Sequence, residues 1–172
     1  LALRTSLENQ LETLNQAILK IMDAQNEQEA AKIIFSNLEK IGYKKGLLSL
    51  INDGTGKLEG KYANGKNWGR LKSRLSYGLS GKNILAQALR TRSPILAKNS
   101  LQDHRWNRKI AAESNILSHY VIPLTVQNEP IGVLQIDLSD DQKLVHGDKA
   151  VFQRKMQILN TFANQCAIAI RN

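Results

Sequence analysis

Two apolar runs near the C-terminal end of the chain, joined by four turn-forming residues, restrict the possible fold more than any other feature. His119 to Val126 and Ile131 to Leu138 are each long enough for a strand, and Gln127-Asn128-Glu129-Pro130 between them is typical of a hairpin turn. Strands that follow one another through a short turn pair antiparallel. The runs therefore predict a mainly antiparallel sheet.

An earlier part of the chain predicts a second hairpin. The apolar run 47–51 is followed by the turn sequence 52–56, and residues 57–64 can return as the partner strand. Ile95 to Ala97 adds a brief strand. The stretch 65–77 has little periodicity and much charge, so it is predicted to be a loop.

Helices are predicted before, between and after these strands. Asn26 and Glu29 have the spacing of a capping box, and Gly42 supplies the stop for the helix that follows. Ser80 is placed to cap a helix that ends before Pro94. The closing helix has its apolar face at Phe152, Leu159, Phe162, Cys166 and Ile170.

The first helix carries a narrow apolar seam. Its members recur at alternating spacings of four and three residues: Leu7, Leu11, Leu14, Ile18 and Ile21. Such a stripe suits a partner helix better than a broad globular core. We therefore expect residues 1–24 to form an N-terminal signalling and dimerisation helix, followed by a sensory domain over 25–172. Packing of this helix on its own domain is the alternative.

Charge is concentrated in the middle of the chain. The 172 residues carry a net charge of +9, yet thirteen Lys or Arg residues within 57–109 face only Glu59 and Asp103. These basic residues are spread over several predicted elements with few aromatic residues among them, so we expect no nucleic-acid binding. No apolar run approaches the length of a membrane span, so no membrane partner is expected. The length and apolar content suit one domain with one core.

Several short motifs follow one another along the chain. They are Gly78-Leu79-Ser80-Gly81, Ala86-Gln87-Ala88, Arg92-Ser93-Pro94-Ile95, Asp103, Ser118 to Leu124, Glu129 to Leu134, and the closing helix with Phe152, Leu159, Phe162 and Ala163. In their order and spacing they resemble the GAF family over roughly residues 20–172. The resemblance implies an α+β fold, in which a five- or six-stranded antiparallel sheet has the terminal helices on one face and a ligand cavity on the other.

The family resemblance also implies a function. Members are regulatory modules of larger cytoplasmic signalling proteins, such as two-component sensor kinases and response regulators. On this interpretation the helix 148–172 leads to a downstream output domain, and the chain forms a homodimer through its terminal helices. A dimerisation and transmission module that binds no ligand is the alternative.

The segment Asp103-His104-Arg105-Trp106 is the predicted ligand site. It offers a carboxylate, an imidazole, a guanidinium and an indole, and it lies within the basic part of the chain. We expect Arg105, Trp106 and His104, together with Tyr120, to bind a small anionic or aromatic ligand. A surface loop with Trp106 packed as an anchor is the alternative.

Catalytic and covalent cofactor functions are not expected. The three histidines stand in separate segments without metal-ligand spacing, and no serine or cysteine has an identifiable base. Family members with a covalent bilin attach it through a cysteine in the loop corresponding to 99–118, where this chain has none. The single cysteine, Cys166, is predicted to lie in the core. No identity can be predicted for a cofactor.

Overall fold

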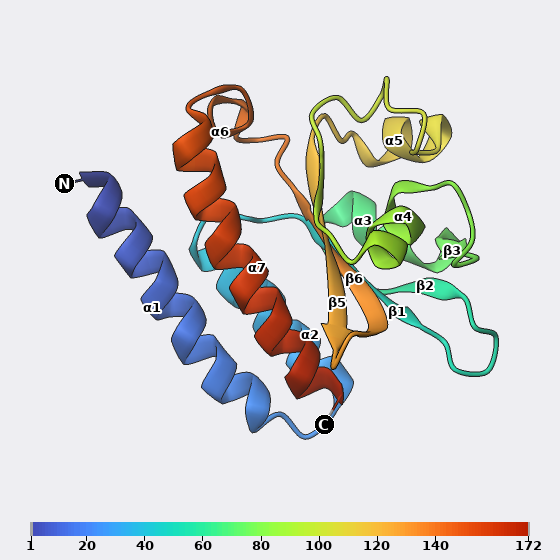
Figure 1. Ribbon diagram of the computed structural model, residues 1–172, viewed down its shortest axis with the longest axis horizontal. Helices are drawn as coiled ribbons and strands as arrows, with labels where there is room; N and C mark the ends of the chain where they lie inside the picture. Colours follow the sequence, from blue (N-terminus) through green and yellow to red (C-terminus); the bar gives the residue numbers. More distant parts are fainter. Residues whose placement is uncertain (1, 172) are drawn as a thin grey trace.

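A six-stranded antiparallel sheet, with strand order β3-β2-β1-β6-β5-β4, forms the centre of the molecule (Figure 1). The computed structural model describes residues 2–171. The strands are β1 (Gly46–Ile51), β2 (Leu58–Asn64), β3 (Ser76–Tyr77), β4 (Ile95–Ala97), β5 (His119–Val126) and β6 (Glu129–Asp137). The helices are α1 (Ala2–Met22), α2 (Glu27–Lys40), α3 (Lys66–Leu71), the 3-10 turn η1 (Lys72–Arg74), α4 (Ile84–Thr91), α5 (Arg108–Ser114), α6 (Gln142–His146) and α7 (Lys149–Arg171). The predicted α+β class and antiparallel sheet are confirmed.

The hairpin of β5 and β6 is tighter than the sequence indicated. Its loop is Gln127-Asn128, with φ angles of 51° and 66°, and β6 begins at Glu129 rather than at Ile131. Two successive positive φ angles are the geometry of a two-residue hairpin turn whose twist matches that of the strands. Asn128 tolerates this region better than most residues.

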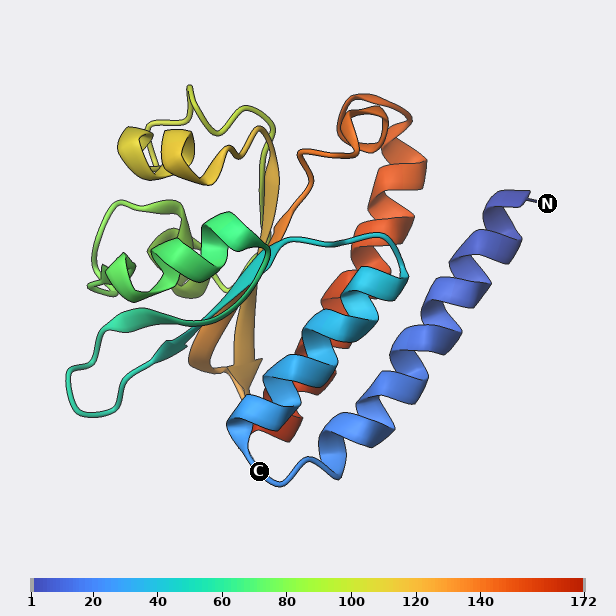
Figure 2. The ribbon, with the colours of Figure 1, turned by 180° about the vertical axis from the view of Figure 1, so that it is seen from behind.

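Helices cover both faces of the sheet (Figures 1 and 2). The long helices α1, α2 and α7 lie on one face, which we call the terminal-helix face, and α3, α4 and α5 lie on the other, which we call the α3–α5 face. Alternate residues of each strand supply the two cores because side chains along a strand point to opposite faces. In β5, Tyr120 and Ile122 join the terminal-helix core, whereas Val121 joins the α3–α5 core.

Helix α1 packs on its own domain along one side of its predicted seam. Leu14, Ala17 and Ile21 are buried against the terminal-helix core, as the alternative interpretation required. Leu11 and Leu19 remain exposed at 41% and 66%. The helix therefore has one apolar side buried in the domain and further apolar groups facing outward.

The predicted loop 65–77 is wrong. It contains α3, η1 and β3, because Trp68, Leu71 and Leu75 are buried in the α3–α5 core and fix the segment. Because charged residues lie between these three apolar ones, the apolar residues did not stand out in the sequence. Tertiary packing orders the segment even though its sequence shows no sustained period.

Two predicted caps need correction. The side chain of Asn83, not that of Ser80, caps α4 by accepting from the amide of Ala86. Asn26 caps α2 as expected, but the Glu29 carboxylate accepts from the backbone N–H of Gln25 instead of that of Asn26.

The segment after β6 forms α6, whose Leu144 and Val145 are buried. Cys166 lies in the core, as predicted. Within residues 2–171, none of the helices combines the length and apolar character needed to cross a bilayer.

Candidate functional site

Four buried polar side chains meet on the α3–α5 face and form what we call the buried polar cluster: Trp68, Trp106, His119 and Gln135. Each comes from a different element. Trp68 lies in α3, Trp106 precedes α5, His119 begins β5, and Gln135 belongs to β6. No member is more than 2% exposed. Burial of this much hydrogen-bonding capacity requires partners, so the contacts of each group decide what the site can do.

The three aromatic rings of the cluster are in contact. The ring centroids of Trp68 and Trp106 lie 6.1 Å apart at an interplanar angle of 63°, and those of Trp106 and His119 lie 5.1 Å apart at 47°. Both distances are within the range of favourable aromatic contacts. Trp106 therefore lies between a helix of the α3–α5 layer and the sheet beneath it.

His119 is neutral in the folded protein. Burial lowers the pKa of its imidazole from 6.5 to about 3, an effect that nearby Asp103 opposes and Arg105 reinforces. Its Nδ1 lies 2.7 Å from the Oγ of buried Ser100. The ring thus has one nitrogen bound to a hydroxyl and one, Nε2, without a partner among the described residues.

Gln135 is placed beside this ring by the register of β5 and β6. Val121 pairs with Gln135 and His119 with Asp137, so Gln135 is the diagonal neighbour of His119 on the same face. Among the described residues, neither its amide nitrogen nor its amide oxygen has a hydrogen-bond partner. A buried amide without any partner is an uncommon feature of a folded domain.

The unpaired buried polar atoms are confined to one face of the sheet. Within residues 2–171 they are Trp68 Nε1, Tyr77 Oη, Trp106 Nε1, His119 Nε2 and both amide atoms of Gln135; Asp137 Oδ2 also lacks a hydrogen bond but lies 4.0 Å from Lys45 Nζ in an ion pair. All belong to residues of the α3–α5 face or of its packed periphery. Each such atom costs about 1–3 kcal/mol unless something else binds it.

The predicted site residues are only partly brought together. Trp106 is central to the cluster. Arg105 lies at its rim and is held by Asp103, with Nε–Oδ1 and Nη2–Oδ2 distances of 2.9 and 2.6 Å. This pair lowers the pKa of the Asp103 carboxyl. His104 is exposed to solvent.

The structure does not bring Tyr120 together with Trp106. Tyr120 lies on the terminal-helix face, where its hydroxyl is within 3.1–3.3 Å of the side-chain amide of Asn160 in α7 and its ring contacts Phe152. Adjacent residues of a strand point to opposite faces, so the residue next to it, His119, is the one that meets Trp106.

Three members of the cluster were not predicted from the sequence: Trp68, His119 and Gln135. Trp68 was placed in a loop. Strand alternation was the one sequence signal for His119 and Gln135. Both are polar residues within apolar strands, at positions that must be buried. That signal identifies which residues are unusual but not which elements lie above them.

A basic surface surrounds the cluster. The segment 57–117 carries thirteen Lys or Arg residues and three acidic ones, a net charge of +10, whereas the rest of the chain carries −1. Lys66, Lys82, Lys98, Arg108 and Lys109 are exposed on this part of the molecule. The electrostatic potential outside the buried polar cluster is therefore positive.

Comparison with known proteins agrees with this architecture. The sequence model of the GAF domain matches residues 24–171. The chain belongs to the GAF domain family. A comparison with curated protein sequences gave no match.

Solved structures share the GAF fold over nearly the whole chain. The GAF domain of a phosphoenolpyruvate-protein phosphotransferase from Coxiella burnetii has a TM-score of 0.78 at 20% identity, covering 96% of this chain and 94% of that one. A free methionine-R-sulfoxide reductase from Neisseria meningitidis, solved in complex with its substrate, has a TM-score of 0.73 at 16% identity, with coverage of 96% and 90%. The A. aeolicus nlh2 GAF domain has a TM-score of 0.70 at 17% identity, with coverage of 98% of each chain.

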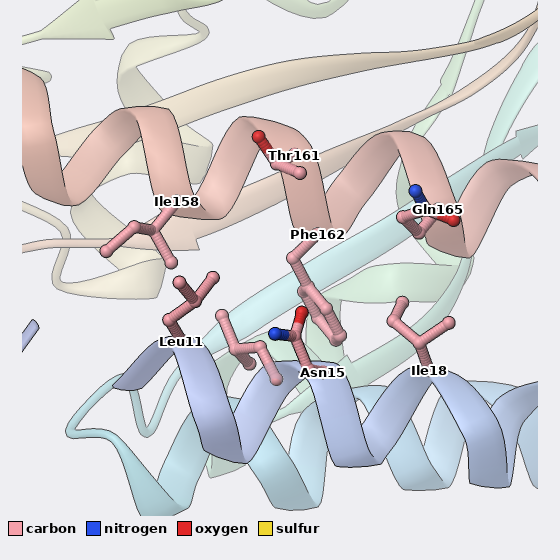
Figure 3. A pocket seen from close by; sticks show the side chains of 8 residues that line it. Leu11, Asn15, Ile18, Ile158, Thr161, Phe162 and Gln165 are labelled. Carbon is pink, nitrogen blue, oxygen red and sulfur yellow. The ribbon is translucent and has the colours of Figure 1, made fainter. Parts of the chain in front are cut away.

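The opposite face of this GAF domain carries a groove between α1 and α7 (Figure 3). It has a volume of about 210 Å³, and Leu11, Ile18, Ile158 and Phe162 supply most of its apolar lining. Leu11 and Ile18 project from α1 toward the side chains of α7. The groove therefore lies where the two longest helices of the domain run side by side.

Proposed function

We propose that this GAF domain is a regulatory sensing module of a larger signalling protein, and that it binds a small molecule at the buried polar cluster. The supporting observation is the set of unpaired polar atoms on Trp68, Trp106, His119 and Gln135. A domain selected for stability alone would fill these positions with apolar residues of similar volume. Unsatisfied groups of this kind are typical of functional sites.

Signal output through the terminal helices follows from the arrangement of the sheet. Strand β5 carries His119 on the α3–α5 face and Tyr120 on the terminal-helix face, where Tyr120 contacts Asn160 and Phe152 of α7. A change in the position of β5 on ligand binding is thereby passed to α7 by direct contact. We propose that residues 1–24 and 148–172 serve as input and output helices of a cytoplasmic two-component protein, such as a sensor kinase or a response regulator.

The groove between α1 and α7 supports a homodimer in which the terminal helices of two copies pack together. Leu11, Leu19 and Met22 of α1 and Ile168 of α7 are exposed, at 41–67%. Large apolar groups gathered along two neighbouring helices are characteristic of association surfaces. A change in how these helices pair would then be the output of ligand binding.

No catalytic activity forms part of the proposal. The similar sulfoxide reductases bear an enzyme name, but Cys166 is the only thiol here, it is buried, and its burial raises its pKa. Chemistry based on a thiol needs an accessible thiolate. The alternative of a ligand-free transmission module has the same groove in its favour, but it gives no reason for the buried polar cluster.

Native mass spectrometry of the purified chain tests the proposal directly. We expect a dimer that retains a small-molecule mass from the host cell, and loss of that mass in the variant Gln135→Leu. A dimer without added mass, both before and after incubation with a metabolite extract, would favour the ligand-free transmission module.

A further inference from the structure

The hydrogen-bonding atoms of the buried polar cluster are mainly donors. Each indole Nε1 carries a hydrogen and cannot accept, so Trp68 and Trp106 contribute one donor each. The amide of Gln135 adds its NH₂ group, with one acceptor oxygen. The tautomer of His119 decides whether the imidazole is a further donor.

Counting unsatisfied groups assigns that tautomer. If Nδ1 carried the proton, it would donate to Ser100 Oγ, and both the Ser100 hydroxyl hydrogen and Nε2 would lack a partner among the described residues. If Nε2 carries the proton, Ser100 donates to Nδ1 and only the Nε2–H is unpaired. The second arrangement leaves one unsatisfied group instead of two, so His119 presents Nε2–H.

The cluster thus presents N–H groups from four side chains within the buried α3–α5 core. A carbonyl oxygen accepts about two hydrogen bonds, whereas a carboxylate has about four acceptor positions. Donors in a water-poor site stabilise a negative oxygen more strongly than a neutral one. The number and type of these donors therefore fit a carboxylate.

The charges near the cluster limit the ligand to a single negative charge. His119 is neutral, and the guanidinium of Arg105 is already matched by Asp103. The interior thus offers dipoles rather than free cations, which favours a monoanion over a dianion such as a phosphate monoester. The basic surface outside attracts an anion toward the site without neutralising it inside.

We infer that the ligand of this GAF domain is a small carboxylate with an apolar body, whose oxygens accept from His119 Nε2–H, from the indole N–H groups of Trp68 and Trp106, and from the side-chain amide of Gln135. Its apolar body would pack against the core around Val121 and Ile110. This inference rests on the proposed sensing function and specifies the chemistry of the same site. Because all four side chains are buried, binding requires displacement of residues that cover them, and Trp106 lies in the segment between β4 and α5 that does so.

The two tryptophans of the chain are both members of the cluster, so their indole N–H signals report on this site alone. The experiment is a titration of the ¹⁵N-labelled chain, followed by proton–nitrogen NMR. The probes are benzoate, 3-phenylpropionate and 4-methylpentanoate, each paired with its primary amide. We expect at least one carboxylate to shift both indole N–H signals downfield with saturation, and to bind at least about tenfold more tightly than its amide, because hydrogen bonds to a charged acceptor are stronger than those to a neutral one.

Variants separate recognition from folding. Trp68→Phe keeps a ring but removes one N–H, and Gln135→Leu keeps the volume but removes the amide. Each is expected to weaken carboxylate binding about tenfold. Tyr120→Phe removes a polar group from the other face and should leave the affinity unchanged. Equal weakening by all three would mean that binding depends on general stability, and it would overturn the assignment.

The outcomes for the two proposals are distinct. If amides shift the indole signals and carboxylates do not, the ligand class is wrong while the sensing function stands. The same holds if native mass spectrometry finds a bound compound that lacks a carboxylate. If neither series shifts the signals and no bound mass is found, both proposals fail, and enclosed water molecules would then satisfy the cluster.

Discussion

The imidazole of His119 and the indole of Trp106 lie with their centroids 5.1 Å apart, and neither the Nε2 of one nor the Nε1 of the other has a hydrogen-bond partner among the described residues. His119 starts a strand of the sheet, whereas Trp106 belongs to the layer above it. The contact therefore joins the sheet to its cover through two side chains that could bind a ligand between or beside them.

Burial of His119 should make the stability of the domain depend on pH. The folded pKa is depressed from 6.5 to about 3, so between these values the unfolded chain binds a proton that the folded chain does not. The free energy of unfolding should therefore fall by up to about 1.4 kcal/mol for each pH unit below 6.5. Urea unfolding of the wild type and of His119→Phe across this range measures the effect, because the variant should lack that slope.

His104 provides the matched control for this measurement. It is exposed, so His104→Gln should keep the pH dependence that burial of His119 causes. An identical slope in His119→Phe and wild type would show that the imidazole is not buried as a neutral ring.

Replacement of Gln135 by leucine should stabilise the unliganded domain. The substitution removes two unpaired buried polar atoms at nearly constant volume, so the free energy of unfolding should rise by about 1–3 kcal/mol. Thermal or urea unfolding measures this gain. Gln153→Leu, at an exposed position of α7, is the control and should change stability by less than about 0.5 kcal/mol. A loss of stability in Gln135→Leu would mean that the amide is bonded in the resting protein.

Tyr120→Phe should affect stability alone. Its hydroxyl loses the contact with Asn160, which should cost about 0.5–1.5 kcal/mol in unfolding experiments. Ligand affinity should stay unchanged, because the ring lies on the terminal-helix face. A tenfold loss of affinity would contradict the separation of the two faces.

Leu11→Glu should weaken the proposed dimer. The side chain is 41% exposed and lines the groove between α1 and α7, so a carboxylate there would have to be desolvated when a second copy packs on it. Sedimentation velocity should show a dimerisation constant weakened at least about tenfold. Leu101→Glu, at a site 45% exposed and distant in sequence from both helices, should leave association unchanged. If the wild-type chain remained monomeric at high concentration, the proposal that the groove is a dimer surface would be contradicted.

The strands and long helices of the domain could be predicted because each carries its own periodic signal. The runs that became β5 and β6, the turn at 52–56 and the stripe of the closing helix needed no knowledge of distant residues. Short elements such as α3 and β3 could not be predicted from the sequence. Trp68 and Leu71 are held by packing in the α3–α5 core, and this packing exists only once the sheet beneath them has formed.

The candidate site was predicted less completely than the fold. A local cluster of polar residues drew attention to the segment 103–106, and one of its members, Trp106, is central to the observed cluster. The prediction included Tyr120 but not His119, which is the residue whose ring contacts Trp106. The face of the sheet to which a strand residue points depends on the register of the whole strand. A register shift of one residue reverses that face.

The family, the antiparallel sheet and the placement of the long helices can be predicted from the chain, because these depend on local periodicity and on the order of motifs. That Trp68, Trp106, His119 and Gln135 meet at one site, with polar atoms that have no partner among the described residues, is a result of the assembled fold. Those residues come from four elements far apart in the sequence, and strand register and helix packing bring them together. Hydrogen-bond satisfaction is a property of that assembled arrangement.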